Sequence, residues 1–174
     1  DDSVFDALER TGFEDGERPL TGAIGELNGR VIAATPNGVW FDPSYPWELL
    51  RTNEQILYAH PALADVDERV KESARVHESA VVGENVLIGP DCTVSAGAVV
   101  KSGSCLLSST IVGENAVLEG SIVGPDARVG ANALLRDTIV GGGATIGDGT
   151  VSPGRTATLV VDGVEHTDRR LGGV

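Results

Sequence analysis

The sequence has 174 residues, with 26 acidic and 13 basic side chains and a formal net charge of −13. A chain of this length can bury a core of its own, but so acidic a surface is a poor partner for nucleic acid or an anionic membrane. No apolar run is long enough to span a bilayer and no signal segment opens the chain, so we expect a cytoplasmic protein.

The basic residues are unusual because only Lys71 and Lys101 are lysines and the other eleven are arginines. High negative charge with little lysine is typical of proteins that work in concentrated salt, which screens their self-repulsion. We therefore expect a halophile, and simple solubility is the alternative explanation. The chain begins at Asp1 and contains no methionine, which indicates a piece of a longer protein.

The first part of the chain predicts a small α/β segment. The run "DSVFDALERTGF", residues 2–13, has the apolar spacing of a short amphipathic helix. Residues 29–42, "GRVIAATPNGVWFD", predict two strands joined by a turn at "TPNG". Residues 44–59, "SYPWELLRTNEQILYA", predict a second helix that opens at Ser44 with Pro46 and Trp47 in its first turn.

A period of six residues begins at Val70. Every sixth residue is Val, Ile or Leu, apart from two steps of five residues that start at Leu118 and Leu135. We call these residues the anchors; they are Val70, Val76, Val82, Ile88, Val94, Val100, Leu106, Val112, Leu118, Val123, Val129, Leu135, Val140 and Ile146. A period of six is neither helical nor the simple alternation of an ordinary strand, so it predicts short strands separated by sharp corners.

Two further positions of the repeat are restricted. The residue four places after an anchor is small in almost every hexad, and Cys92 fills it once. Glycine directly follows seven anchors, at positions 83, 89, 113, 124, 130, 141 and 147, and we expect it to ease the backbone into the corner. Because the repeat favours small residues, we interpret Cys92 and Cys105 as small buried fillers and not as a disulfide or metal site.

This pattern resembles the hexapeptide repeat of left-handed parallel β-helix proteins, in which three hexads make one triangular coil. The resemblance implies a mainly β fold over residues 70–152, preceded by the small α/β segment. Proteins of this kind commonly associate through the faces of the prism, so we expect a homotrimer. Residues 153–174 predict a projecting hairpin around Asp162 and Gly163, "TATLVVDGVEHT", and then a truncated return to the β-helix.

A second resemblance covers nearly the whole chain. The order "GERPLTGAIGEL", "VWFDPSYPWELLRTNEQIL" and then hexads resembles the end of the catalytic domain of archaeal sugar-1-phosphate nucleotidylyltransferases and the β-helix fused to it. These include the bifunctional UDP-N-acetylglucosamine pyrophosphorylases that also acetylate glucosamine-1-phosphate. Residues 1–60 then correspond to the C-terminal remnant of the catalytic domain, and residues 61–69 to a linker.

The family resemblance implies a sugar phosphate and a nucleoside triphosphate as substrates of the parent enzyme, with Mg²⁺ as its cofactor. Asp42 stands where a family aspartate can help to hold the catalytic magnesium. This sequence has Pro-Ser-Tyr after Asp42 where the family often has Val-Gly-Thr, and Gly22 where an aspartate often stands. The Gly-rich nucleotide loop and the PKP segment belong to the N-terminal part, so we expect no nucleotidyltransferase activity from this fragment alone.

Acetyl transfer in the superfamily uses a histidine base and acetyl-CoA, so the three histidines are of interest. His60 precedes a proline in the linker, and His77 lies in "RVHESAVVG", which resembles an opening coil found whatever the activity. His166, in "VEHTDRRLGGV", lies beyond the regular hexads and is the candidate base. The three are too scattered for the zinc site of a β-helical carbonic anhydrase.

Arg155, Arg169 and Arg170 are the only concentration of basic residues on the chain. Guanidinium groups bind phosphates well, so these arginines are candidates for holding the CoA diphosphate or a sugar phosphate. Pairing with surface carboxylates is the alternative. The Asn and His of the family's acetylating segment are absent after "GDGT" at 147–150, and only Arg155 matches its arginine.

Three functions therefore stay open: the C-terminal region of a nucleotidylyltransferase with a trimerising β-helix, an acetyl-CoA-dependent acetyltransferase on an amino-sugar phosphate, and a purely structural oligomerisation module. An ice-binding prism is excluded because it needs ranks of threonine, whereas we take the outward positions here to be Glu, Asn and Asp.

Overall fold

The computed structural model describes residues 3–13, 15–27, 32, 34–35, 37, 40–59 and 69–152, and the backbone of residues 156–161 and 164–168. The chain divides into two compact units, Asp1–Trp40 and Phe41–Val174, and each is described separately. None of the helices in these ranges is long and apolar enough to cross a membrane.

The first unit holds two short helices that pack against each other, α1 (Ser3–Arg10) and α2 (Leu20–Gly25). Ala7 and Ala23 are the buried residues of the two helices. The first helix lies where the sequence predicts it. The second was missed, because "LTGAIG" contains two glycines and has a low intrinsic helix propensity.

Arg18 stabilises the C-terminal end of α1, where backbone carbonyls have no partner within the helix. Its Nη1 donates to the carbonyl oxygens of Leu8 at 2.7 Å and Thr11 at 3.0 Å, and also to that of Glu9. The guanidinium carbon also lies 4.5 Å from the centre of the Phe13 ring. The two strands expected over residues 29–42 fall largely outside the described residues.

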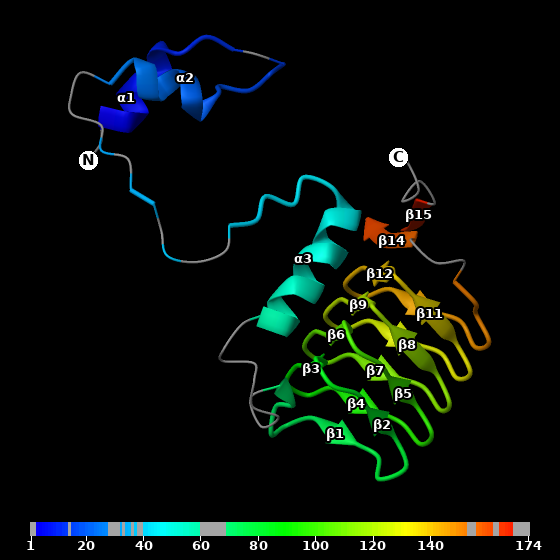
Figure 1. The fold of residues 1–174 in the computed structure, drawn as a ribbon. Coiled ribbons are helices and arrows are strands. Elements are labelled where there is room, and N and C mark those ends of the chain that lie inside the picture. The colour runs from blue at the N-terminus through cyan, green and yellow to red at the C-terminus, as the bar shows by residue number, and fades with distance from the viewer. Residues whose placement is uncertain are drawn as a thin grey trace. The chain divides into compact units, whose positions relative to one another are not determined.

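The second unit is a β-helix made of three sheets, one on each side of a triangular coil (Figure 1). The β1 sheet contains β1 (Arg75–Val76), β4 (Thr93–Val94), β7 (Ile111–Val112), β10 (Arg128–Val129) and β13 (Thr145–Ile146). The β2 sheet contains β2 (Val81–Val82), β5 (Val99–Val100), β8 (Val117–Glu119) and β11 (Leu134–Arg136). The β3 sheet contains β3 (Leu87–Ile88), β6 (Cys105–Leu106), β9 (Ile122–Val123), β12 (Thr138–Val140), β14 (Thr156–Val161) and β15 (Val164–Asp168).

Neighbouring coils pair in parallel and in register, so that each anchor lies over an anchor of the next coil. Val76 pairs with Val94, and Val94 with Val112. Eleven of the fourteen anchors are buried, while Val76, in the first coil, is 36% exposed. The mainly β fold with a left-handed parallel β-helix is thus confirmed.

The corners are built by residues in the left-handed backbone region. Twelve described residues of the β-helix have positive φ, one at each corner from Asn85 onward, and all are Asn, Asp, Ser or Gly. They are Asn85, Asp91, Gly97, Gly103, Ser109, Asn115, Gly120, Asp126, Asn132, Asp137, Gly143 and Gly149. These residue types tolerate that conformation best.

The role expected for the glycines that follow the anchors was wrong. They are not the residues with positive φ; in the regular hexads those stand two places further along. A Cβ on Gly113 would lie 2.6 Å from the Ala131 nitrogen of the next coil, and one on Gly130 would lie 2.5 Å from the Asp148 nitrogen. At Gly113 and Gly130, glycine is therefore required by the close approach of stacked coils and not by the turn.

The two five-residue steps lie at the same corner, between the β2 and β3 sheets. There the left-handed residues, Gly120 and Asp137, follow their anchors by two places instead of three. A Cβ on Gly120 would lie 2.8 Å from the Asp137 carboxylate. Each of these two corners is thus one residue shorter than the others. Because both lie at the same place in successive coils, the coils stay stacked.

The helix α3 (Pro46–Ala59) lies along the β3 sheet (Figure 1). Its start is fixed by Glu48, whose Oε2 accepts from the backbone N–H groups of Ser44 at 2.9 Å and Tyr45 at 3.0 Å. Leu50 packs against an outward-facing apolar cluster of the β3 sheet, made of Cys105, Ile122 and Ile139. The predicted helix is confirmed, and it covers one of the three faces.

The two cysteines are free and buried, as the sequence indicates, but they differ in position. Cys92 points into the β-helix, where its Sγ lies 2.8 Å from the carbonyl oxygen of Leu107. Cys105 instead faces outward, beneath α3. Burial raises the pKa of both thiols, that of Cys105 to about 11.

The outward positions of the strands also differ from our expectation. The residues that face outward are those directly before the anchors, whereas Glu, Asn and Asp lie at the corners. None of the described faces presents a row of threonines. The β1 sheet, which has the most, presents Arg75, Thr93, Ile111, Arg128 and Thr145.

Candidate functional site

Asp42, the candidate magnesium ligand, is exposed and lies four residues before α3. Among the described residues, no group of three or more His, Cys, Asp or Glu side chains gathers closely enough to hold a metal ion. Asp42 by itself therefore does not make a magnesium site.

His166 lies in β15, which pairs antiparallel with β14 and places His166 opposite Leu159. The strand β14 pairs in parallel with β12, so this hairpin extends the β3 sheet beyond the regular coils. The candidate arginines Arg155, Arg169 and Arg170 lie outside the described residues, as does His60.

A groove of about 410 Å³ surrounds His77, on the β1 sheet. The lining residues come from two stacked coils and from the corner of a third; they are Arg75, Val76, His77, Thr93, Val94, Ser95, Ala96 and Glu114. The in-register pairing of β1 with β4 brings Arg75 beside Thr93. The groove combines one guanidinium, one imidazole and one carboxylate.

The hydrogen bonds of His77 define its tautomer. The backbone N–H of Ser79 donates to Nδ1 at 3.2 Å, and the Ser79 hydroxyl lies 2.8 Å from the same nitrogen. Because Nδ1 accepts, the neutral ring carries its proton on Nε2. In that form Nε2 is a hydrogen-bond donor and not a general base.

This groove suits the binding of an anion better than proton abstraction. Arg75 and the Nε2–H of His77 are both donors to phosphate or carboxylate oxygens. From the sequence, His77 was considered alone, and Arg75, Ser95 and Glu114 were missed. The signal was present, because residues 18 apart along the repeat, such as Arg75 and Thr93, must stack on the same face.

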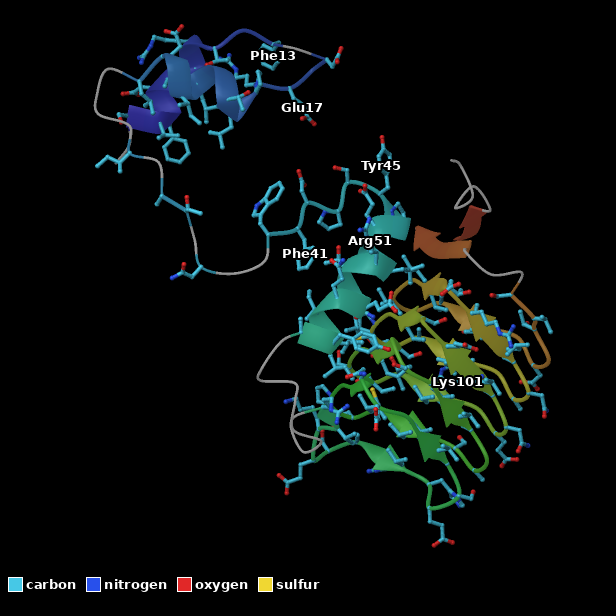
Figure 2. All side chains as sticks on the ribbon, in the orientation of Figure 1. Phe13, Glu17, Phe41, Tyr45, Arg51 and Lys101 are labelled. Carbon is cyan, nitrogen blue, oxygen red and sulfur yellow. The ribbon has the colours of Figure 1, made fainter. Side chains whose placement is uncertain are left out.

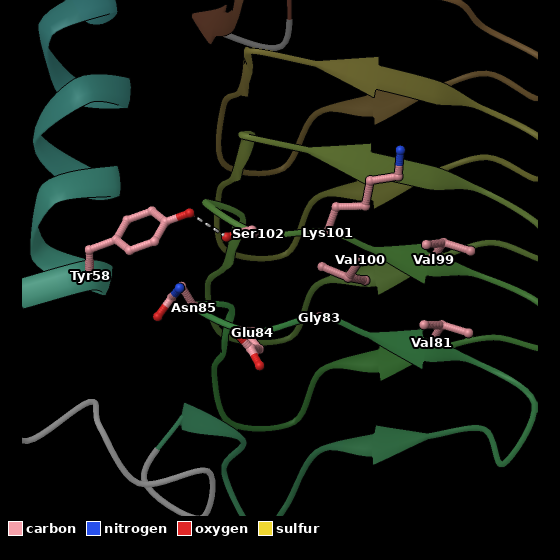
Figure 3. Close-up of a pocket in the computed structure, with 9 residues that line it drawn as sticks. All are labelled: Tyr58, Val81, Gly83, Glu84, Asn85, Val99, Val100, Lys101 and Ser102. Carbon is pink, nitrogen blue, oxygen red and sulfur yellow. Dashed lines mark hydrogen bonds between the residues drawn. The ribbon is translucent and has the colours of Figure 1, made fainter.

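A second groove, of about 470 Å³, lies between α3 and the edge of the β2 sheet (Figure 3). Val81 and Val99 stack on one side of it, and Tyr58 of α3 forms the other side, with its hydroxyl 2.9 Å from the Ser102 hydroxyl. Glu84, Asn85 and Lys101 complete the lining.

Lys101, whose place on the β-helix is marked in Figure 2, is the only cation of this second groove among the described residues. Its Nζ lies 3.2 Å from Glu119 Oε2, and Arg136 Nε lies 3.4 Å from the same oxygen. The amine is thus already paired, and the groove is mainly an apolar surface with a charged edge.

The fold and the repeat define the class as a hexapeptide-repeat β-helix protein. The family model described as GMPPB C-terminal domain matches residues 67–159, which is more than half of the chain. The chain belongs to this family. No curated protein matches it.

Solved structures of acyltransferases are similar to part of the chain. An Arabidopsis UDP-N-acetylglucosamine acyltransferase is 29% identical over 44% of this chain and 29% of that chain, with a TM-score of 0.43. The acetyltransferase domain of PglB from Neisseria gonorrhoeae is 22% identical over 64% of this chain and 63% of that chain, with a TM-score of 0.49. A mutant GDP-perosamine N-acetyltransferase from Caulobacter crescentus is 25% identical over 57% of this chain and 56% of that chain, with a TM-score of 0.38.

The chain spans between 29% and 63% of the length of these three structures. Since every TM-score is below 0.5, no functional conclusion rests on these similarities.

Proposed function

We propose that the chain is the C-terminal region of an archaeal sugar-1-phosphate nucleotidylyltransferase, related to the bifunctional pyrophosphorylases. In this proposal the β-helix assembles the enzyme as a homotrimer, and α3 joins the catalytic domain firmly to it. The family match supports the first part. The packing of α3 on the β3 sheet, through Leu50 and Asn53, supports the second.

The parent enzyme would join a sugar 1-phosphate to a nucleoside triphosphate. The sugar phosphate oxygen attacks the α-phosphorus of the triphosphate, and pyrophosphate leaves. Magnesium, when bound, neutralises charge on these phosphates. Asp42, exposed just before α3, would contribute a carboxylate to that site only together with residues of the remaining catalytic domain.

The test is pyrophosphate release by the full-length parent protein, supplied with sugar 1-phosphates and nucleoside triphosphates. Replacement of Asp42 by Asn should lower the rate at saturating substrate, whereas Glu72→Gln, at an exposed site of the β-helix, should leave it unchanged. Light scattering should give a mass three times that of the chain. Release of pyrophosphate without any sugar 1-phosphate would contradict the proposed reaction. A mass equal to that of one chain in light scattering would contradict the proposed homotrimer.

The acidic charge supports a halophilic setting for the parent protein, which we also propose to be cytoplasmic. The chain has twice as many acidic as basic residues and only two lysines. Its free energy of unfolding should therefore rise as KCl screens the repulsion between carboxylates. An unfolding midpoint that does not change between low and high KCl contradicts the halophile proposal.

Acetyl transfer from acetyl-CoA to an amino-sugar phosphate is the second candidate. The groove at His77 supports it, because Arg75 and His77 offer donors to a phosphate group. His166 remains the proposed base, and Arg155, Arg169 and Arg170 remain proposed phosphate ligands beyond that groove.

Calorimetry with acetyl-CoA separates the two candidates. Binding that is weakened by Arg75→Ala but not by Arg128→Ala, on the same sheet, places the ligand in the His77 groove. Binding weakened by Arg155→Ala or Arg169→Ala places it at the C-terminal arginines. If the His166→Ala variant acetylates as fast as the wild type, His166 is not the base. If acetyl-CoA does not bind at low or high salt, the β-helix serves only as a scaffold.

A further inference from the structure

Gly83 lies in the groove between α3 and the β2 sheet (Figure 3), and neither its backbone conformation nor the stacking of the coils requires glycine there. It is not among the residues with positive φ. A Cβ on Gly83 would lie 3.4 Å from the nearest backbone atoms, Ser102 N and Val100 O, which is an ordinary contact distance. Because the residue is nevertheless glycine, the space stays open, and we call it the Gly83 groove.

The two sides of the Gly83 groove are apolar and are held in place. Val81 is 58% exposed and stacks in register with Val99 of the next coil. Tyr58, on the opposite side, is 59% exposed, and its hydroxyl lies 2.9 Å from the Ser102 hydroxyl, which ties the ring to the β-helix. An aromatic ring that is already tied down loses little conformational entropy when a ligand packs against it.

Two polar side chains of the groove have no partner of their own. Among the described residues, no hydrogen bond or ion pair reaches the carboxylate of Glu84 or the amide of Asn85. Asn85 is half-buried, and its backbone is fixed, with φ at 51° and its carbonyl oxygen accepting from the Gly103 nitrogen at 3.0 Å. A half-buried amide without a partner is uncommon in folded proteins, and a bound ligand would supply the missing hydrogen bonds.

The charge of the Gly83 groove is unfavourable for anions. Lys101 Nζ lies 3.2 Å from Glu119 Oε2 of the next coil, and Figure 3 shows the amine pointing away from Gly83. Among the described residues that line the groove, Glu84 is therefore the charged group without a counter-ion. An unpaired carboxylate repels phosphate and carboxylate groups, whereas it accepts hydrogen bonds from hydroxyl groups.

We propose that the Gly83 groove binds a neutral saccharide. A sugar ring presents apolar C–H groups, which suit the surface between Tyr58 and the two valines, Val81 and Val99. Its hydroxyl groups both donate and accept, which suits the acceptor Glu84 and the amide Asn85. The volume of about 470 Å³ is that of a small-molecule site. This inference does not rest on the proposed function, because the substrates of that reaction are phosphorylated and carry the charge that this groove repels.

An extended peptide fits the groove less well. Peptides of that kind bind by adding a strand to the open edge of a sheet. The Gly83 groove instead lies beside the paired strands β2 and β5, and its free hydrogen-bonding groups belong to side chains.

A pair of glycine substitutions tests the site in the full chain. Gly83 and Gly147 both follow an anchor, are exposed and leave room for a Cβ among the described residues, but Gly83 alone lines this groove. Glucose, mannose and N-acetylglucosamine are the probes, with saturation-transfer NMR as the measurement. At least one sugar should bind the wild type and the Gly147→Leu variant but not the Gly83→Leu variant, whose side chain fills the groove. Binding of none of the three, or binding that Gly83→Leu leaves intact, overturns the proposal.

A second pair of variants removes a polar contact without filling the groove. Asn85 and Asn132 both occupy left-handed corners, with φ of 51° and 58°, so glycine preserves the backbone at either position. Asn85→Gly should raise the dissociation constant of the sugar by about five- to tenfold, and Asn132→Gly, at a different corner, should leave it unchanged. Equal dissociation constants for Asn85→Gly and the wild type overturn the proposal.

Charged sugars test the selection against anions. The same sugars as 1-phosphates should bind the Gly83 groove more weakly than the free sugars at low salt, and Glu84→Gln should narrow the difference. Binding of a 1-phosphate that Arg75→Ala weakens and Gly83→Leu does not belongs to the His77 groove and agrees with the proposal. A 1-phosphate that binds more tightly than its free sugar, and is lost in Gly83→Leu, overturns the assignment of a neutral ligand.

Discussion

The side-chain amide of Asn53 donates to the backbone carbonyl of Gly103, with Nδ2 and the oxygen 2.9 Å apart. The bond joins the middle of α3 to a corner of the β-helix across 50 residues of sequence. Five residues further along the helix, the Tyr58 hydroxyl lies 2.9 Å from the Ser102 hydroxyl. The two contacts fix α3 to successive residues of one corner, so the helix and the β-helix form a single packed unit.

Replacing Asn53 by Ala should therefore loosen α3 from the β3 sheet. The Gly103 carbonyl would lose a half-buried partner, and we expect the free energy of unfolding to fall by about 1 kcal/mol. Chemical denaturation measures this value, and hydrogen exchange should show faster exchange confined to α3. The control is Gln55→Ala, which changes an exposed side chain of the same helix. Equal effects of the two substitutions would contradict the role given to the Asn53 bond.

The glycines that follow the anchors allow a comparison between two equivalent positions. An added methyl group at Gly113 meets the backbone of Val129, Gly130 and Ala131 at 2.6 to 2.9 Å, whereas at Gly147 the nearest neighbour among the described residues would be the Thr150 hydroxyl at 3.7 Å. Gly113→Ala should lower the free energy of unfolding by about 2 kcal/mol or more, because the stacked backbones must separate. Gly147→Ala should be tolerated within about 0.5 kcal/mol. Thermal or chemical unfolding of the two variants decides this, and similar losses would show that the space between coils is not what selects glycine.

The β-helix could be predicted from the sequence because its core repeats. Each anchor makes the same contacts one coil above and below, so a period of six is written into the order of aliphatic residues, and the buried anchors from Ile88 to Ile146 follow it. The long helix was also predictable, from its apolar spacing and from Pro46 at its start. The helix α2 was not, since "LTGAIG" is held by packing on α1 and not by its own propensity.

The candidate sites were harder to predict, because the anchors show which residues point inward but not which faces remain free. Residues before the anchors, such as Val81 and Val99, became meaningful only when α3 proved to cover the β3 sheet. Likewise, His77 was considered without Arg75, which is near in sequence but becomes part of a groove only through the stacking of β1 on β4. The proposed residues Arg155, Arg169 and Arg170 stay predictions.

The left-handed corner at Asn132 should prefer glycine or asparagine to alanine. Its φ is 58°, a conformation that costs most L-residues about 1 kcal/mol or more because of the Cβ. Asn132→Ala should reduce the free energy of unfolding by about 1 kcal/mol, and Asn132→Gly should restore most of that loss. The measurement is chemical denaturation of the three proteins side by side. A glycine variant no more stable than the alanine variant would show that the asparagine side chain matters more than the backbone conformation.

The buried thiol of Cys105 should make the protein less stable in alkaline solution. Burial beneath α3 raises its pKa from 9.0 to about 11, with a smaller contribution from the negative charge of Cys92. Because the pKa is higher in the folded state than in the unfolded chain, unfolding releases a proton above pH 9. The stabilisation is fully present below the unfolded pKa and is lost as the pH rises from about 9 to about 11.

Comparison of the wild type with Cys105→Ala isolates this effect, because all other groups that titrate in this range are present in both proteins. Between pH 9 and pH 11 the free energy of unfolding of the wild type should fall relative to the variant, by up to about 1.4 kcal/mol per pH unit. Denaturant titrations across this range give the two curves. Parallel curves would mean that the thiol ionises equally well in the folded and unfolded protein, and would thus contradict its burial under α3. Slow alkylation of Cys105 at about pH 8, below the ordinary thiol pKa, accelerated by Asn53→Ala, would connect that burial to the docking of the helix.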